Sequence, residues 1–475
     1  MKQPLRRVLV ALTGVAVGSS LLAAPAGALN VVEPGSSGIG DSYFSKDGNG
    51  GYDVAHYDIH DTYGVYTGRL RGWTGITATA LDDLSSFNLD LVLTPDSVTV
   101  DGRLAAFRKS GRHELVVTPT VPLTSGTRFA VRVRYHGTPS TITYDGASPW
   151  LSVSGEAMAM NEPHIAPWWF PANDHPSDKA AFDITVKVRS GKQAISNGHL
   201  VGRTRSENWT SWHWRMRQPM ATYLAFFAAG GFRLERGVTN GLPWTNAVSR
   251  WYAKPVEDQQ LRLMRRTPGI IAWLETQLVD YPFSSSGGVV TSLATGFALE
   301  NQSRPTYPYL GSGPNAVAVV VHELAHQWFG DQVSVERWRD IWLNEGFASW
   351  VEWRYAETHG GETAQHRLRR EYAARPATRS FWTLPISNPG PGRLFNAPVY
   401  DRGAMTLQAL RQRIGNADFF ELLRTWLAQN ADGNARVDEF TTLAEDVSGE
   451  NLDAFFGAWL DRGSRPARTA ANGLL

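Results

Sequence analysis

Two histidines and a glutamate in one short segment have the residue types and the spacing of a metal site. His322, Glu323 and His326 lie in an apolar stretch, residues 319–330, that contains no helix breaker before its final glycine. This pattern predicts a buried helix, and on a helix side chains four positions apart share one face. Both imidazoles can therefore bind one metal ion, while Glu323 reaches the metal-bound water without being a ligand.

A second carboxylate supplies the ligand that the histidine pair lacks. Catalytic zinc takes three protein ligands and leaves a fourth position open. Glu345 opens the next predicted helix, and residues 327–344 are enough for a turn and a return helix that brings it opposite the histidines. We therefore predict one Zn²⁺ ion held by His322, His326 and Glu345, with Glu323 as general base. Glu352, on the same helix face as Glu345, either orients a histidine or is a solvated charge.

Composition limits the classes of partner. A chain of 475 residues predicts two or three domains. Its formal net charge of +1 provides no basic field, so we expect neither nucleic acid nor an anionic membrane as a partner. The absence of cysteine excludes disulfides and thiolate metal ligands.

The N-terminal residues have the pattern of an export signal. Residues 1–28 carry basic side chains, then an apolar run, and they end in Ala26-Gly27-Ala28. We predict a signal peptide cleaved after Ala28, and hence a secreted protein, rather than an uncleaved membrane anchor. No later segment is apolar for long enough to span a bilayer. Residues 29–51 are rich in Gly and Ser and are predicted to form a flexible lead-in.

The hydrophobic pattern changes its period along the chain. Period-two alternation, as in residues 129–135 and 182–188, predicts strands of a β-sandwich or saddle over residues 52–236. Helical spacing, as in residues 261–279 and 343–358, predicts a mainly helical domain over residues 237–475. The fold class expected is therefore α+β and multidomain.

Several segments together resemble a known family. They are V-H-E-L-A-H-Q-W-F-G-D at 321–331, W-R-D-I-W-L-N-E-G-F-A-S-W at 338–350, and F-P-A-N-D-H-P at 170–176 followed by Lys179. This is similar to the aminopeptidase N and leukotriene hydrolase family of gluzincin zinc metallopeptidases, over most of residues 50–410. The resemblance implies an N-terminal β-saddle domain, a thermolysin-like catalytic domain, and peptides or proteins cleaved at their N-termini as substrates.

Three further site residues follow from the resemblance. Tyr400 stands where the family has Y-E-K-G-A and is expected to donate a hydrogen bond to the oxyanion. Glu300 matches the family's G-A-M-E-N, and Glu162 resembles its second carboxylate that binds the substrate α-amine. Phe297 and Leu299 replace the Gly and the Met of that motif, so the wall of the substrate site is expected to be bulkier.

Other functions stay open at this point. The same zinc site can serve an endopeptidase or an enzyme of a non-peptide substrate such as an epoxide. The fold can also be a binding module without catalysis. A third alternative is that the Trp-rich segment 167–170 makes the β-domain a carbohydrate-binding module.

Overall fold

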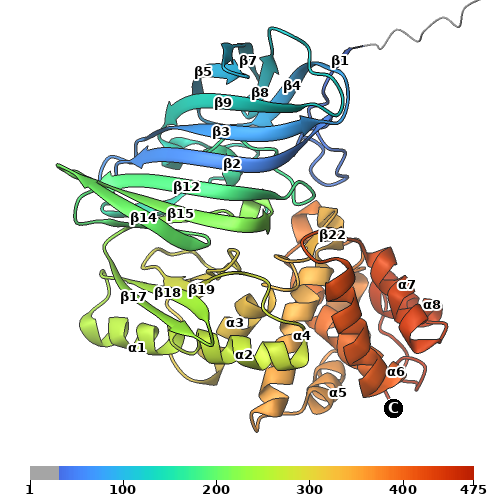
Figure 1. The fold of residues 1–475 in the computed structure, drawn as a ribbon. Helices are drawn as coiled ribbons and strands as arrows, with labels where there is room; N and C mark the ends of the chain where they lie inside the picture. Colours follow the sequence, from blue (N-terminus) through green and yellow to red (C-terminus); the bar gives the residue numbers. More distant parts are fainter. Residues whose placement is uncertain (1–31) are drawn as a thin grey trace, which may run out of the picture. The chain divides into compact units, whose positions relative to one another are not determined.

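The computed structural model describes residues 32–475, and the predicted signal peptide at residues 1–28 lies outside this range. Within it, a β-rich part comes first and a mainly helical part follows (Figure 1). This order confirms the α+β fold class. Among the described residues, no helix is long and apolar enough to cross a membrane.

An eight-stranded sheet forms the largest layer of the β-rich part, and alternate side chains of its central strands are buried. The strand order is β14-β15-β12-β2-β3-β9-β5-β6, in which only the β12–β2 pair is parallel. The strands span Tyr52–Tyr63 (β2), Leu70–Ala80 (β3), Thr94–Val100 (β5), Arg103–Leu104 (β6), Arg128–Gly137 (β9), Ala180–Arg189 (β12), His199–Ser206 (β14) and Trp209–Met220 (β15).

Two four-stranded sheets complete this part, in the orders β1-β4-β8-β7 and β10-β11-β16-β13. Their strands span Glu33–Pro34 (β1), Leu84–Asp90 (β4), Ala106–Ser110 (β7), Glu114–Thr118 (β8), Leu151–Val153 (β10), Glu156–Ala159 (β11), Gln193–Ser196 (β13) and Phe227–Gly230 (β16). Strand β4 ends at Asp90. Beyond it the backbone changes partners, since Leu91 N donates to His113 O and Val92 N to Pro167 O.

The helical part contains a small sheet, β17-β18-β19-β20, and a two-stranded pair, β21-β22. The strands span Phe232–Thr239 (β17), Leu242–Ser249 (β18), Ser286–Val290 (β19), Thr306–Tyr307 (β20), Ser334–Val335 (β21) and Asn434–Ala435 (β22). The helices span Lys254–Met264 (α1), Thr267–Gln277 (α2), Pro314–Ala325 (α3), Trp342–Thr358 (α4), Ala364–Ala374 (α5), Ala397–Gln429 (α6), Val437–Ser448 (α7) and Asp453–Phe456 (α8). The predicted domain boundary at residues 236 and 237 lies within β17, and it stays a prediction.

The predicted helices are present, with two differences in their bounds. The helix expected over residues 261–279 is two helices, α1 and α2. Pro268 lies in the first turn of α2, where its missing N–H costs no hydrogen bond of the helix. The helix expected through residue 329 ends at Ala325, and His326 keeps the helical conformation as its C-cap (φ −58°, ψ −24°). The spacing of the two histidines is therefore still that of a helix.

The Trp-rich segment is part of the core. Trp168, Trp169 and Phe170 are at most 1% exposed. Trp169 packs edge-on against Phe170 and Phe227. Aromatic rings buried in this way present no face to a sugar, so the segment is not the carbohydrate-binding surface considered above.

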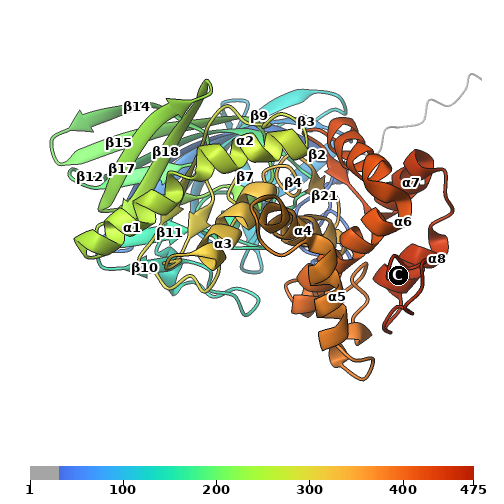
Figure 2. The ribbon, with the colours of Figure 1, turned by 90° about the horizontal axis from the view of Figure 1, so that it is seen from below.

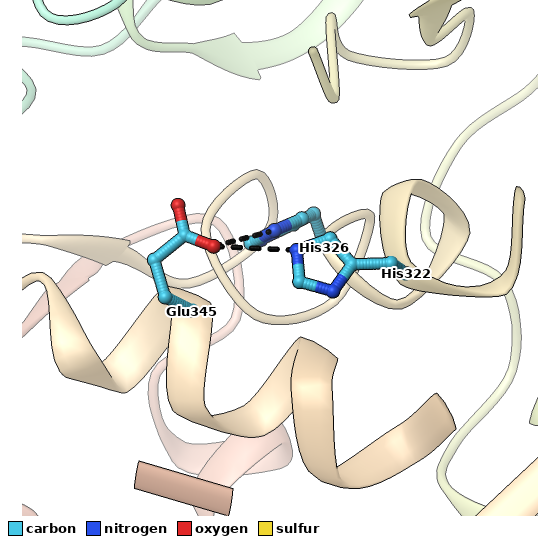
Figure 3. Close-up of side chains that lie close together, drawn as sticks. All are labelled: His322, His326 and Glu345. Atoms are coloured by element: carbon cyan, nitrogen blue, oxygen red, sulfur yellow. Dashed lines mark hydrogen bonds and ion pairs between the residues drawn. The ribbon is translucent and has the colours of Figure 1, made fainter. Parts of the chain in front are cut away.

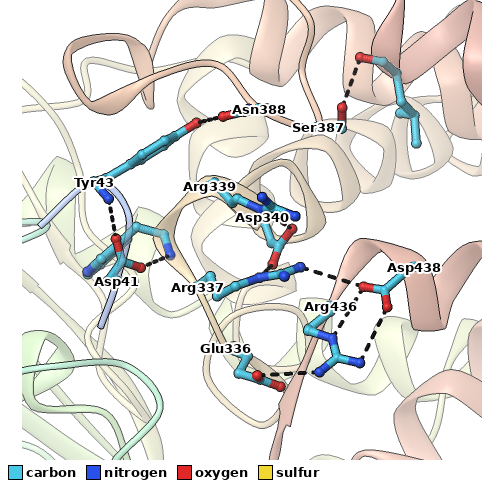
Figure 4. Close-up of polar contacts among 12 residues, drawn as sticks. Asp41, Tyr43, Glu336, Arg337, Arg339, Asp340, Ser387, Asn388, Arg436 and Asp438 are labelled. Atoms are coloured by element: carbon cyan, nitrogen blue, oxygen red, sulfur yellow. Dashed lines mark hydrogen bonds and ion pairs between the residues drawn. The ribbon is translucent and has the colours of Figure 1, made fainter. Parts of the chain in front are cut away.

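The lead-in and the β-rich part are bonded to the helical part. Asp41 Oδ2 accepts a hydrogen bond from Trp338 N at 3.0 Å, and the Tyr43 hydroxyl accepts one from Gly390 N at 2.7 Å and contacts the Asn388 side chain (Figure 4). A second link is buried. Lys179 Nζ donates to the carbonyl oxygens of Asp331, Gln332 and Gly433 at 2.9, 2.8 and 3.2 Å.

Helix α4 lies between α3 and α6 and contacts both (Figures 1 and 2). On α4 and α6, two glycines face each other at close range. A Cβ atom on Gly346 would lie 2.9 Å from the Cα of Gly403, and one on Gly403 would lie 2.6 Å from the Cα of Gly346. Glu345 and Tyr400 are close in sequence to this contact, so the two glycines fix how these side chains reach the same site.

We expect Gly346→Ala to destabilise the protein by about 1–3 kcal/mol, because the added methyl group meets backbone that cannot yield. The midpoint of chemical denaturation measures the loss. Gly269→Ala, in α2, is the matched control, since a Cβ there meets nothing within 4 Å. Equal stability of Gly346→Ala and the control would contradict the close packing.

Candidate active site

Helix α3 carries the histidine pair at its C-terminal end. Its apolar side chains Val320, Val321 and Leu324 are fully buried, which fixes the rotation of the helix. His322 and His326, one turn apart, then project from the same side, with ring centroids 4.8 Å apart. The expected sharing of one helix face is confirmed.

Glu345, in the first turn of α4, reaches both imidazoles (Figure 3). Its Oε2 atom lies 3.3 Å from Nε2 of His322 and 3.4 Å from Nε2 of His326. Four ligands at the Zn–N and Zn–O bond lengths of about 2.0–2.1 Å stand about 3.3–3.4 Å apart at the corners of a tetrahedron. The donor atoms are therefore spaced as a zinc site requires, and the three side chains form one.

The outer nitrogen of each imidazole has its own partner. His322 Nδ1 lies 2.7 Å from Glu352 Oε1, and His326 Nδ1 lies 3.0 Å from the carbonyl oxygen of Phe329. These contacts hold each Nδ1 as the protonated nitrogen and leave Nε2 free for the metal. Of the two alternatives left open for Glu352, the structure supports the one in which it orients a histidine.

The electrostatics of the site favour a cation. Burial alone lowers an imidazole pKa, but Glu345 and Glu300 raise the pKa of His326 to about 9. Burial alone raises a carboxyl pKa, but His326 and His322 hold the pKa of Glu345 at about 2. Burial also raises the pKa of Glu323 to about 8. Several buried carboxylates thus surround two imidazoles, and a dication there would offset their charge.

A cavity of about 360 Å³ opens over these residues. All seven predicted site residues line it, together with apolar side chains of the wall: Glu162, Phe297, Ala298, Leu299, Glu300, Val319, His322, Glu323, His326, Glu345, Phe395 and Tyr400. The Tyr400 ring is parallel to that of His322, with the centroids 6.0 Å apart. The structure thus brings together the seven predicted site residues, and the individual roles of Glu323, Tyr400, Glu300 and Glu162 stay predictions.

Two carboxylates of the cavity come from different parts of the chain. Glu300 lies just before β20, and Glu162 follows β11 of the β-rich part. Burial, and then the neighbouring Glu300, raise the pKa of Glu162 well above its usual value. Among the described residues, Glu162 Oε1 is buried and has no hydrogen-bond partner. This pair can therefore bind a small cationic group.

Two cavity neighbours were missed by the sequence analysis. The hydroxyl of Tyr223 donates to Glu300 Oε1 at 3.3 Å, and Phe395 lines the cavity. Neither belongs to a motif or to a periodic pattern. They reach the site only through the packing of distant segments, so no local signal would have found them.

Comparison with known protein families finds two matches along the chain. Residues 85–224 match the Peptidase M1 N-terminal domain, and residues 299–459 match the Peptidase family M1 domain. The first covers much of the β-rich part, and the second contains the three zinc ligands.

Two aminopeptidases are similar to this chain in sequence, at 27% and 28% identity. Aminopeptidase N of Lactococcus lactis subsp. lactis is 27% identical over 446 residues, which cover 87% of this chain and 51% of that protein. Aminopeptidase M1-D of Oryza sativa subsp. japonica is 28% identical over 321 residues, covering 62% of this chain and 36% of that protein. The chain thus spans about half the length of the bacterial relative.

Solved structures of similar length share the fold. The M1 zinc metallopeptidase of Deinococcus radiodurans is 27% identical, with a TM-score of 0.80 over 90% of this chain and 98% of that one. A mutant of that enzyme bound to a Tyr-Ser-Ala substrate matches with a TM-score of 0.79, over 91% of this chain and all of that one. The two-domain arrangement predicted from the sequence is confirmed.

We expect Glu352→Gln to weaken zinc binding by about 10–100-fold, because His322 loses the carboxylate that orients it. Competition with a chromogenic chelator measures the affinity. The matched control is Glu362→Gln, since Glu362 lies 2.6 Å from the exposed His366 and away from the cavity. Unchanged zinc affinity in Glu352→Gln would show that the contact does not support the metal.

Proposed function

From the premise that the chain belongs to the M1 peptidase family, with its N-terminal and its catalytic domain, we propose that it is a zinc-dependent aminopeptidase. One observation carries the proposal. The cavity that holds the zinc ligands also holds Glu300, which is buried, and Glu162, whose Oε1 atom is buried without a hydrogen-bond partner among the described residues. A peptide's free α-ammonium is a cation of the right size, and internal peptide bonds lack it.

In the proposed mechanism, different residues bind the metal and transfer the proton. His322, His326 and Glu345 would hold Zn²⁺, which when bound lowers the pKa of a water and polarises a carbonyl. Glu323 would take the proton of the attacking water and pass it to the leaving amine. The Glu323 carboxylate lies beside the metal ligands, since one of its oxygens is within 4.8 Å of a carboxylate oxygen of Glu300 and of a ring nitrogen of His326.

Binding energy would come from the carboxylates and from the tyrosine. Glu300 and Glu162 would hold the α-ammonium and so set which peptide bond lies beside Glu323. The Tyr400 hydroxyl would donate a hydrogen bond to the oxyanion that develops at the scissile carbonyl. Burial, then the charges of Glu345 and the other glutamates, keep the pKa of Tyr400 well above its usual value, so it stays a donor.

We expect Glu323→Gln to retain as much zinc as the wild type and to lose kcat by about 10²–10⁴-fold, because an amide cannot accept the proton. Metal analysis and hydrolysis of aminoacyl fluorogenic substrates measure the two effects. Glu421→Gln, at an exposed position, is the control and should retain wild-type turnover. Full activity of Glu323→Gln would rule out its role as general base.

The endopeptidase alternative makes an opposite prediction for blocked substrates. We expect N-acetylation of a peptide to lower kcat/KM by about 10²–10³-fold, because it leaves Glu300 and Glu162 without a counterion in the occupied cavity. In Glu300→Gln the ratio between free and acetylated peptide should shrink. Efficient cleavage of acetylated peptides by the wild type would instead favour an endopeptidase.

We also propose that the protein is exported. The proposal rests on the sequence of residues 1–28, with its basic start, its apolar run and its Ala-Gly-Ala end. Mass spectrometry of protein expressed from the full sequence in a bacterial host should find Leu29 as the N-terminus in the exported fraction. Retention of an intact N-terminus inside the cell would contradict it.

A further inference from the structure

A second group of metal-ligating side chains is buried in the β-rich part, outside the active-site cavity. Asp90 is the last residue of β4, Glu114 is the first residue of the neighbouring strand β8, and His113 directly precedes it. Their exposed fractions are 1%, 6% and 5%, and one ligand atom of each lies within 4.8 Å of the others. None of the three lines the active-site cavity.

Oxygen atoms gather around one nitrogen of this group. His113 Nε2 lies 3.0 Å from the carbonyl oxygen of Lys46, 3.4 Å from Asp90 Oδ1 and 3.6 Å from Glu114 Oε2. The His113 ring is held by stacking on Tyr144, with the centroids 4.5 Å apart. Donor atoms about 3.0–3.6 Å apart are spaced as ligands of one ion with bonds near 2.0–2.2 Å.

Two oxygens of the group are unsatisfied. Asp90 Oδ2 accepts from Asn49 Nδ2 at 3.1 Å and from Asp174 N at 2.8 Å, whereas Oδ1 has no hydrogen-bond partner among the described residues. The same is true of Glu114 Oε1. A single proton on His113 Nε2 serves the Lys46 carbonyl and leaves these atoms bare. Buried acceptors of this kind normally have a partner.

Among the described residues the group has no close lysine or arginine partner, and the charge of Lys109 acts on its carboxylates only from a distance. Lys109 donates to the carbonyl oxygen of Leu91, and the described residues place no lysine or arginine nitrogen within 4.0 Å of either carboxylate. Burial raises the pKa of Glu114 to about 7 and lowers that of Lys109 to about 8. Burial, then Glu114 and Asp174, raise the pKa of Asp90 well above its usual value. A dication would remove this cost.

We propose that Asp90, His113, Glu114 and the carbonyl oxygen of Lys46 bind a second divalent metal ion. One imidazole among oxygen donors suits a transition-metal ion better than Ca²⁺ or Mg²⁺, whose sites are built from oxygen alone. Zinc is the expected occupant, because it stands above manganese and iron in the usual order of affinities.

The position of this ion suggests a structural role. Lys46 belongs to the lead-in, and the lead-in residue Asn49 is bonded to both Asp90 and Asn173. A few residues earlier, Asp41 and Tyr43 contact the helical part. The ion would therefore fasten the lead-in to the β4–β8 pair and support its contacts with the domain that carries the active site.

Zinc stoichiometry in a protein without the catalytic ligands tests the proposal. Full-length His322→Ala/His326→Ala protein is stripped with a chelator, dialysed against Zn²⁺ and analysed for metal. We expect one equivalent per chain, and none when Asp90→Asn and His113→Gln are added. Uptake of no zinc by the first protein, or unchanged uptake by the second, overturns the proposal. Neither outcome depends on peptidase activity, so the proposed function is tested separately.

Two further measurements guard against misfolding and surface binding. Titration of the His322→Ala/His326→Ala protein with Co²⁺ should give ligand-field absorption that saturates at one equivalent and is lost when zinc displaces the cobalt. This measurement leaves Asp90 and His113 unmutated, so misfolding of those variants does not affect it. Absence of this signal also overturns the proposal. His136→Gln is the matched control, because His136 lies 2.8 Å from Asp96 in an exposed pair. Loss of the zinc equivalent in His136→Gln would show that the ion binds at the exposed pair, which overturns the proposal.

Discussion

The buried charge around His322, His326 and Glu345 is the constraint on which the active-site architecture depends. Charged groups taken out of water are costly unless opposite charge lies beside them. Here the donor atoms stand 3.3 and 3.4 Å apart, longer than a strong ion pair and matched to the edge of a zinc tetrahedron. The protein must therefore keep two helices in a fixed relation for the metal to bind at all.

The packing of α3, α4 and α6 provides this relation. Buried apolar side chains of α3 set the direction of the imidazoles, and the close contact of Gly346 with Gly403 sets the distance between α4 and α6. Glu345 and Tyr400 occupy the two sides of that contact. Because backbone meets backbone there, the spacing is less adjustable than a contact between flexible side chains.

The β-rich part completes the site. Glu162 and Tyr223 come from it, and both act on the region around Glu300: one as a second carboxylate and the other as a hydrogen-bond donor. Lys179 and the lead-in hold the same part against the catalytic domain. The cavity therefore depends on the interface between the two parts, and a zinc site on the helices alone would lack half of the groups that could select an N-terminus.

The sequence by itself determined the features that depend on local geometry. The spacing of His322 and His326 follows from one turn of helix, and the period-two pattern of residues 129–135 and 182–188 located β9 and β12. The need for a third zinc ligand then pointed to Glu345, and the family motifs to Glu300, Glu162 and Tyr400. The spacing and alternation can be read from the sequence because a helix or strand imposes its period within a few residues.

Only the tertiary structure decided which distant groups meet. It buried Trp168 and Trp169 in the core, ended β4 at Asp90, joined Tyr223 to Glu300, and brought Lys46 to the Asp90, His113 and Glu114 group. In most of these cases the contacting residues are far apart in the chain. In the case of β4, the backbone exchanges one hydrogen-bonding partner for another where the strand ends. Their contact depends on how whole sheets and helices pack, which a local sequence pattern does not encode.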